Sequence, residues 1–142
     1  MNVLVDTSVW SLALRRKEED LNAQERLLVG ELGELIKDGR AKIIGLIRQE
    51  LLSGIRTRDQ FEKLREALRA FPDEPVSTED YEAAAKANND CRTKGVSVSV
   101  VDILICAVAL QRDLLVFTTD PGFKNYTKVL SLKFYPISKK SG

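Results

Sequence analysis

Four carboxylates of this 142-residue chain occupy positions where packing gives an acid little to do. Asp6 follows the apolar run at residues 1–5. Glu50 lies among leucines, and Asp102 and Asp120 flank the last predicted helix and strand. The carboxyl ends of parallel strands meet at one edge of a sheet, where open α/β sheets bind ligands. A cluster of carboxylate oxygens suits hard cations such as Mg²⁺ and Mn²⁺, so the pattern indicates a metal site for phosphoryl chemistry.

Three of these acids also have a structural interpretation. Asp6 and Asp102 could cap a helix or complement its dipole in the first turn. Asp120 precedes a proline and a glycine and could simply open a turn. Taken together, the four acids favour a metal site, because carboxylates brought close together repel and a divalent cation relieves that repulsion.

Glu50 is the acid that capping does not explain, because it lies inside a predicted helix. Its structural alternatives are an ion pair with Arg48 or Arg56, or a position at an exposed edge. An acid beside an apolar helix face is expected to need a partner.

The chain contains no histidine, which removes several kinds of chemistry. Histidine-based triads, HExxH zinc sites and paired-histidine RNA cleavage are all excluded. Acid and base roles must fall to carboxylates, lysine, tyrosine or metal-bound water.

The elements that position the acids follow from apolar spacing and cap residues. Strands are predicted near residues 1–5, 41–44 and 114–118, and helices near 7–14, 22–37, 46–55, 61–71, 78–94 and 99–111. Alternating strands and helices predict a three-layer α/β/α sandwich around a mostly parallel sheet. We expect one domain over residues 1–138 and a loose tail at 139–142.

Composition and segment lengths predict a cytoplasmic protein. The amino terminus enters a strand without signal-peptide features, and the longest apolar stretch, residues 98–110, is too short for a membrane span. Cys91 and Cys106 lack the spacing of zinc or redox motifs and fit a reducing compartment as ordinary small residues.

Local clusters of basic residues accompany a net charge of only +1. Arg15, Arg16, Arg56 and Arg58 follow the elements that carry Asp6 or Glu50, which makes them candidate contacts to the phosphates of a nucleic acid. A solvated surface is the alternative explanation for each cluster.

Four motifs occur in an order that resembles a known family. They lie at residues 6–9, 49–54, 102–109 and 118–123, and each contains one of the four acids. The chain resembles a PIN-domain protein over nearly its whole length, most closely the VapC-type toxin ribonucleases of prokaryotic toxin–antitoxin pairs.

The resemblance implies a metal-dependent endoribonuclease in which Asp6, Glu50, Asp102 and Asp120 match the family's acidic quartet. It also implies supporting hydroxyls at Thr7 or Ser8 and at Thr118, which could hold a metal-bound water or a carboxylate. Many relatives carry a further acid where this chain has Gly122. A second metal is therefore expected to bind weakly, or only with RNA present.

Our hypothesis for the mechanism assigns a role to each acid. Asp6, Asp102 and Asp120 hold one Mg²⁺ or Mn²⁺, directly or through water. Glu50 completes the site and orients the attacking water.

The resemblance also implies two protein partners, a cognate antitoxin that inserts a peptide near the active site and a second copy of the chain. The helices around residues 27–36 and 61–71 could supply those surfaces, or they could be core.

Three other functions are alternatives to a toxin ribonuclease. One is a PIN nuclease of RNA maturation or decay without an antitoxin. Another is a non-catalytic PIN-like binding module whose acids bind basic side chains. The third, a haloacid-dehalogenase-type phosphatase, would need an acid at Ser8, so the sequence disfavours it.

Overall fold

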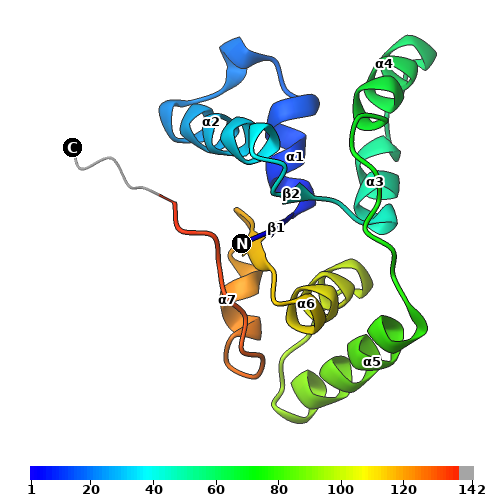
Figure 1. The fold of residues 1–142 in the computed structure, drawn as a ribbon, viewed down its shortest axis with the longest axis vertical. Coiled ribbons are helices and arrows are strands. Elements are labelled where there is room, and N and C mark those ends of the chain that lie inside the picture. The colour runs from blue at the N-terminus through cyan, green and yellow to red at the C-terminus, as the bar shows by residue number, and fades with distance from the viewer. Residues whose placement is uncertain (138–142) are drawn as a thin grey trace.

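A parallel three-stranded sheet runs through the middle of the fold. The computed structural model describes residues 1–137. Its elements, in chain order, are β1 (Val3–Val5), α1 (Thr7–Leu14), the 3₁₀ turn η1 (Glu18–Asp20), α2 (Ala23–Lys37), β2 (Ala41–Lys42), α3 (Gly45–Leu52), α4 (Arg58–Leu68), α5 (Thr78–Thr93), α6 (Val100–Arg112), β3 (Leu115–Phe117) and α7 (Gly122–Tyr126) (Figure 1). The strand order is β2-β1-β3, and both pairings are parallel.

The register of the strands brings the ends of β1 and β3 together. Val5 lies opposite Phe117, and the Asp6 amide donates to the Phe117 carbonyl oxygen at 2.8 Å. The residues that follow these two strands, Asp6 and Thr118, therefore emerge at the same edge of the sheet. This confirms the predicted sandwich, with a sheet whose strand pairs are parallel.

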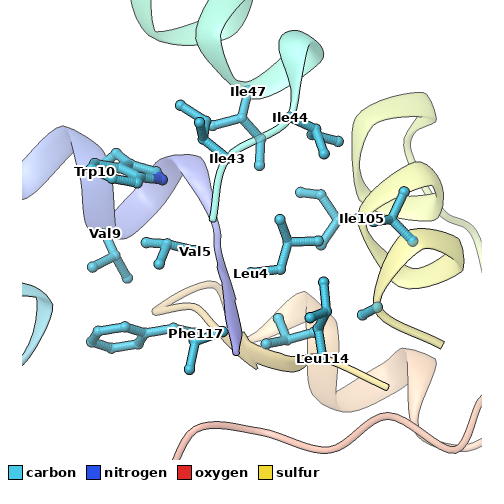
Figure 2. Close-up of a cluster of buried hydrophobic side chains, with 14 of the residues drawn as sticks. Leu4, Val5, Val9, Trp10, Ile43, Ile44, Ile47, Ile105, Leu114 and Phe117 are labelled. Atoms are coloured by element: carbon cyan, nitrogen blue, oxygen red, sulfur yellow. The ribbon is translucent and has the colours of Figure 1, made fainter. Parts of the chain in front are cut away.

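Helices cover both faces of β1, which explains why this strand is apolar without alternation. Val3, Leu4 and Val5 are fully buried. Figure 2 shows Val5 on the side of Val9 and Trp10 of α1, and Leu4 on the side of Ile105 of α6. Figure 1 shows α1 and α2 on one side of the strands and α6, backed by α5, on the other.

Two predicted helices have different boundaries in the structure. The helix predicted at 61–71 is α4, which begins earlier because the Thr57 side chain accepts from the Gln60 amide and caps it. It ends at Leu68, whose carbonyl accepts from Arg48 at 2.9 Å. The helix predicted at 46–55 ends at Leu52, ahead of Gly54, which has a φ of +83°.

Two short elements were not predicted, η1 and α7. Neither has a side-chain N-cap bond, which is the signal that marks helix starts in sequence. The expected tail at residues 139–142 lies outside the described residues. Among residues 1–137, no helix combines the length and apolarity needed to cross a membrane.

Candidate active site

Asp6 lies between the end of β1 and the start of α1. It occupies the N-cap position, yet its side chain makes no cap bond to the helix. Its Oδ2 instead accepts hydrogen bonds from Ser8 Oγ and Thr118 Oγ1, each at 2.8 Å. The side chain is buried with 5% of the residue exposed. Asp6 therefore occupies the predicted cap position, but its carboxylate makes its side-chain hydrogen bonds to the two hydroxyls and not the usual N-cap bond.

The Ser8 and Thr118 hydroxyls connect the first and last parts of the site. The Thr119 amide donates to Ser8 Oγ at 3.0 Å, and the Asp120 amide donates to Thr118 Oγ1 at 3.0 Å. Of the two hydroxyls that directly follow Asp6, that of Ser8 supports the carboxylate. The Thr7 hydroxyl is buried and has no hydrogen-bond partner within the described residues.

Asp102 is held at its backbone and at its side chain. Its amide donates to Ser99 Oγ, the N-cap of α6, at 3.1 Å. Its Oδ2 accepts from the Tyr126 hydroxyl at 2.7 Å. Burial and the bond to Asp102 raise the pKa of Tyr126, so this phenol stays protonated and acts as the donor.

Asp120 and Glu50 are the two exposed acids of the predicted set. Asp120 Oδ1 accepts from the Gly122 amide at 2.8 Å, so Asp120 does also shape the turn before α7. Glu50 lies on α3, and the described residues give it no ion pair, while Arg48 pairs with Asp73 at 3.0 Å. The expectation that Glu50 needs a partner is wrong, because solvent reaches it.

The four acids form one electrostatic group. Burial raises the pKa of Asp6, against the hydrogen bonds from Thr118 and Ser8 that lower it. Burial also raises the pKa of Asp102, and the negative charges of Asp6, Asp120 and Glu50 raise it further, against the Tyr126 hydrogen bond. In the part of the chain that the structure describes, none of the four takes part in an ion pair. Their mutual repulsion is therefore not offset by a cationic side chain there.

The donor set fits a hard divalent cation in kind. All four groups are carboxylates, the ligand type that Mg²⁺ and Mn²⁺ prefer. As they stand, no three acids or thiols of residues 1–137 lie close enough around one point to hold an ion. The set therefore fits the ion by ligand chemistry, and the exposed side chains of Asp120 and Glu50 would have to move for all four acids to reach one ion.

The four predicted arginines are exposed but differ in their contacts. Arg16 forms an ion pair with Glu25 at 3.7 Å and bonds the Asp20 carbonyl. Arg15, Arg56 and Arg58 form no ion pair within residues 1–137. A pocket of about 350 Å³ opens between the end of α1 and α4, lined by Leu14, Arg15, Arg16, Lys17, Ile55, Gln60, Lys63, Leu64 and Ala67.

Sequence reasoning missed Tyr126, although its hydroxyl touches one of the four acids. The spacing of Phe123 and Tyr126 is compatible with one helical turn, and both are buried. That spacing could have indicated a short apolar helix. It could not have indicated that the hydroxyl reaches Asp102, which lies 24 residues earlier.

Comparison with solved structures returns chains of similar fold. The FitAcB structure from Neisseria gonorrhoeae matches with a TM-score of 0.74 and 22% identity, over 94% of this chain and 96% of that one. VapBC2 from Rickettsia felis, bound to a DNA fragment from its promoter, matches with a TM-score of 0.72 and 16% identity, over 95% and 98%. VapBC-5 from Mycobacterium tuberculosis, a member of the VapBC family of toxin–antitoxin systems, matches with a TM-score of 0.64 and 20% identity, over 94% and 98%. At these identities the likeness establishes the fold.

Comparison at the level of sequence identifies the family. No curated protein matches the chain significantly. The family model described as the PIN domain matches residues 3–129, which include all four acids. The chain therefore belongs to the PIN domain family.

Proposed function

We propose that the protein is a metal-dependent endoribonuclease and the toxin of a type II toxin–antitoxin pair. The observation that carries the proposal is that Asp6, Glu50 and Asp120 lie near enough to Asp102 for their charges to raise its pKa. None of the four acids forms an ion pair among residues 1–137. Membership of the PIN family supports a nuclease, because proteins of this family are generally nucleases. The similar toxin–antitoxin structures support the cellular role.

The proposed ligands are Asp6, Asp102 and Asp120, with Glu50 completing the set. Bound there, Mg²⁺ or Mn²⁺ would supply a Lewis acid for a phosphate oxygen and a lowered pKa for a bound water. Ser8 and Thr118 fix the orientation of the Asp6 carboxylate through its Oδ2. Glu50 is free to accept a hydrogen bond from the attacking water and so orient it.

RNA would be held through its phosphates. Arg15, Arg56 and Arg58 are the stronger candidates, because Arg16 is engaged with Glu25. Binding should weaken as salt rises, since phosphate contacts release counterions. Charge reversal of the three arginines should lower RNA affinity and flatten its salt dependence.

The pocket between α1 and α4 is our candidate surface for the antitoxin. Its lining combines apolar Leu14, Ile55 and Leu64 with basic Arg15 and Lys63. An amphipathic peptide with acidic residues fits that combination. We also propose a homodimer and a cytoplasmic location, where RNA and the antitoxin would be met.

RNA cleavage tests the proposal directly. Purified protein, freed of any antitoxin, is incubated with a mixed RNA pool in Mg²⁺, Mn²⁺ or EDTA, beside Asp6→Asn and Asp102→Asn. We expect cutting with metal, none in EDTA, and a loss of at least about 100-fold in both variants. The matched control is Asp59→Asn, an exposed acid on α4 that pairs with Lys63 and should cut like wild type.

Two results would contradict the proposal. Activity retained in Asp6→Asn or Asp102→Asn would remove these acids from the site. Absence of cutting by the folded protein across RNA pools and metals would favour a binding module. A small neighbouring reading frame whose product co-purifies and blocks cleavage would support the toxin role over a nuclease of RNA maturation or decay.

A further inference from the structure

The Tyr126 hydroxyl contacts the acid at the centre of the electrostatic group. It donates to Asp102 Oδ2 at 2.7 Å, within the range of short hydrogen bonds to a charged acceptor. Tyr126 is buried with 6% of the residue exposed. A buried hydroxyl with one short bond to a carboxylate has a defined direction, because breaking that bond would leave both groups without a partner.

The ring that carries this hydroxyl is fixed by core packing. Phe123 and Tyr126 lie on one side of α7 in an edge-to-face arrangement, with ring centroids 5.1 Å apart and planes at 68°. Phe123 is 1% exposed. Tyrosine has few rotatable bonds, so a buried ring sets the position of its hydroxyl more firmly than a long flexible side chain would.

The hydrogen bond opposes a force that acts on Asp102. Negative charges on Asp6, Asp120 and Glu50 repel its carboxylate and favour a rotamer turned away from them. The Ser99 cap fixes only the Asp102 backbone. The Tyr126 bond fixes Oδ2, and within residues 1–137 Oδ1 accepts no hydrogen bond, so it remains available to a ligand.

Gly122 makes room for this arrangement. A Cβ at this position would lie 3.1 Å from Asp120 Oδ1 and 3.4 Å from the Tyr126 hydroxyl oxygen. The Gly122 amide donates to Asp120 Oδ1 at 2.8 Å. The short helix α7 therefore holds two of the four acids. Its first residue, Gly122, binds Asp120 through its amide, and its last residue, Tyr126, binds Asp102 through its hydroxyl.

We propose that Tyr126 is a positioning residue, which holds the Asp102 carboxylate among the other acids so that Oδ1 can bind a divalent cation. This inference rests on the metal site of the proposed function. Tyr126 acts through Asp102 and does not itself touch substrate or metal.

The test compares two tyrosines that make the same kind of bond. The Tyr135 hydroxyl donates to Glu31 at 2.7 Å, and Glu31 is not one of the four acids. Mn²⁺ affinity is measured by calorimetry on the full chain as wild type, Tyr126→Phe and Tyr135→Phe. We expect Tyr126→Phe to weaken Mn²⁺ binding by about 10–100-fold, the usual cost of removing a residue that orients a metal ligand. Tyr135→Phe should bind Mn²⁺ as wild type does.

A second readout separates positioning from general loss of structure. In EDTA, the melting temperature should fall by similar amounts in Tyr126→Phe and Tyr135→Phe, since each variant loses one hydrogen bond of the same kind. RNA cleavage by Tyr126→Phe should recover when Mn²⁺ is raised, because the ligands themselves are intact. A protein with 4-aminophenylalanine at position 126 keeps a donor at the same place and should regain most of the Mn²⁺ affinity.

The outcomes distinguish this inference from the proposed function. Wild-type Mn²⁺ affinity in Tyr126→Phe would overturn the positioning role, even where the wild type cleaves RNA. Weakened Mn²⁺ binding in the 4-aminophenylalanine protein would also overturn the positioning role. This second protein keeps the test decisive if Tyr126→Phe fails to fold. Wild-type Mn²⁺ binding that depends on Tyr126, without RNA cleavage, would support the inference and overturn the nuclease. No Mn²⁺ binding by the wild type would overturn both.

Discussion

Asp80 and Asp102 occupy the same position in two helices that pack against each other, α5 and α6. Each lies three residues after a serine N-cap, and each donates its amide to that serine's hydroxyl, at 3.2 Å for Asp80 and 3.1 Å for Asp102. By sequence position alone, both are first-turn acids that complement a helix dipole.

The two carboxylates have opposite surroundings. Asp80 completes the capping box by accepting from the Ser77 amide at 2.8 Å, and its Oδ2 pairs with Arg112 at 2.6 Å. Within residues 1–137 the Asp102 carboxylate accepts a side-chain hydrogen bond only from a neutral phenol, and the charges of three other acids act on it. In the folded protein the charge of Asp80 is paired with Arg112, whereas Asp102 has no cationic partner among residues 1–137. The same position therefore serves stability in α5 and, in our proposal, metal binding in α6.

The largest effect is expected when Asp80 is replaced, and it is a loss in the free energy of unfolding. Asp80→Ala removes a cap and leaves Arg112 without its partner, so we expect a loss of about 3 kcal/mol. Urea unfolding of the metal-free protein measures it. A loss below about 1 kcal/mol would mean that the pair contributes little to the packing of α5 on α6.

Replacement of Asp102 should change the free energy of unfolding in the opposite direction. Asp102→Asn keeps an acceptor for Tyr126 and removes a charge that burial and three neighbouring acids disfavour. We expect the metal-free protein to gain about 0.5 kcal/mol at pH 8, a figure kept small because solvent screens the cluster. Destabilisation by Asp102→Asn in EDTA would show that the charge is compensated in the native protein.

The smallest expected effect is the pH dependence of the difference in unfolding free energy between Asp102→Asn and the wild type. Burial and the neighbouring acids raise the pKa of Asp102 in the folded protein above its ordinary value, so the folded protein binds this proton more tightly than the unfolded chain. The contribution of Asp102 to the free energy of unfolding is therefore full at pH values below its pKa in the unfolded chain. It is lost as pH rises through the raised pKa of the folded protein. In EDTA, the advantage of Asp102→Asn over wild type should shrink as pH falls from 8 through that value. An advantage that grows on acidification would contradict the direction of the shift.

The sequence predicts most of the framework, because apolar periodicity and serine, asparagine and glycine caps are local signals. The same signals locate the acids, since Asp6 and Asp120 follow apolar strands. They fail where a contact depends on the register between distant segments. Whether Thr7 or Ser8 supports Asp6 depends on a one-residue rotation of α1, and the Tyr126 bond depends on where a five-residue helix packs.

Local sequence signals also do not predict the pairing of Asp80 with Arg112, because 32 residues separate the two side chains. Tertiary packing alone brings these two side chains together. Sequence position could therefore not distinguish the neutralised acid of α5 from the uncompensated acid of α6.

Thermal unfolding with added Mn²⁺ tests most directly the central claim that the charge of Asp102 is left for a cation. A cation that binds only the folded state should stabilise the wild type by about 2.7 kcal/mol at a free concentration 100 times its dissociation constant. Asp80→Asn should start from a lower melting temperature and gain the same increment, whereas Asp102→Asn should gain little. An equal gain in wild type and Asp102→Asn, or no gain in the wild type, would contradict the account.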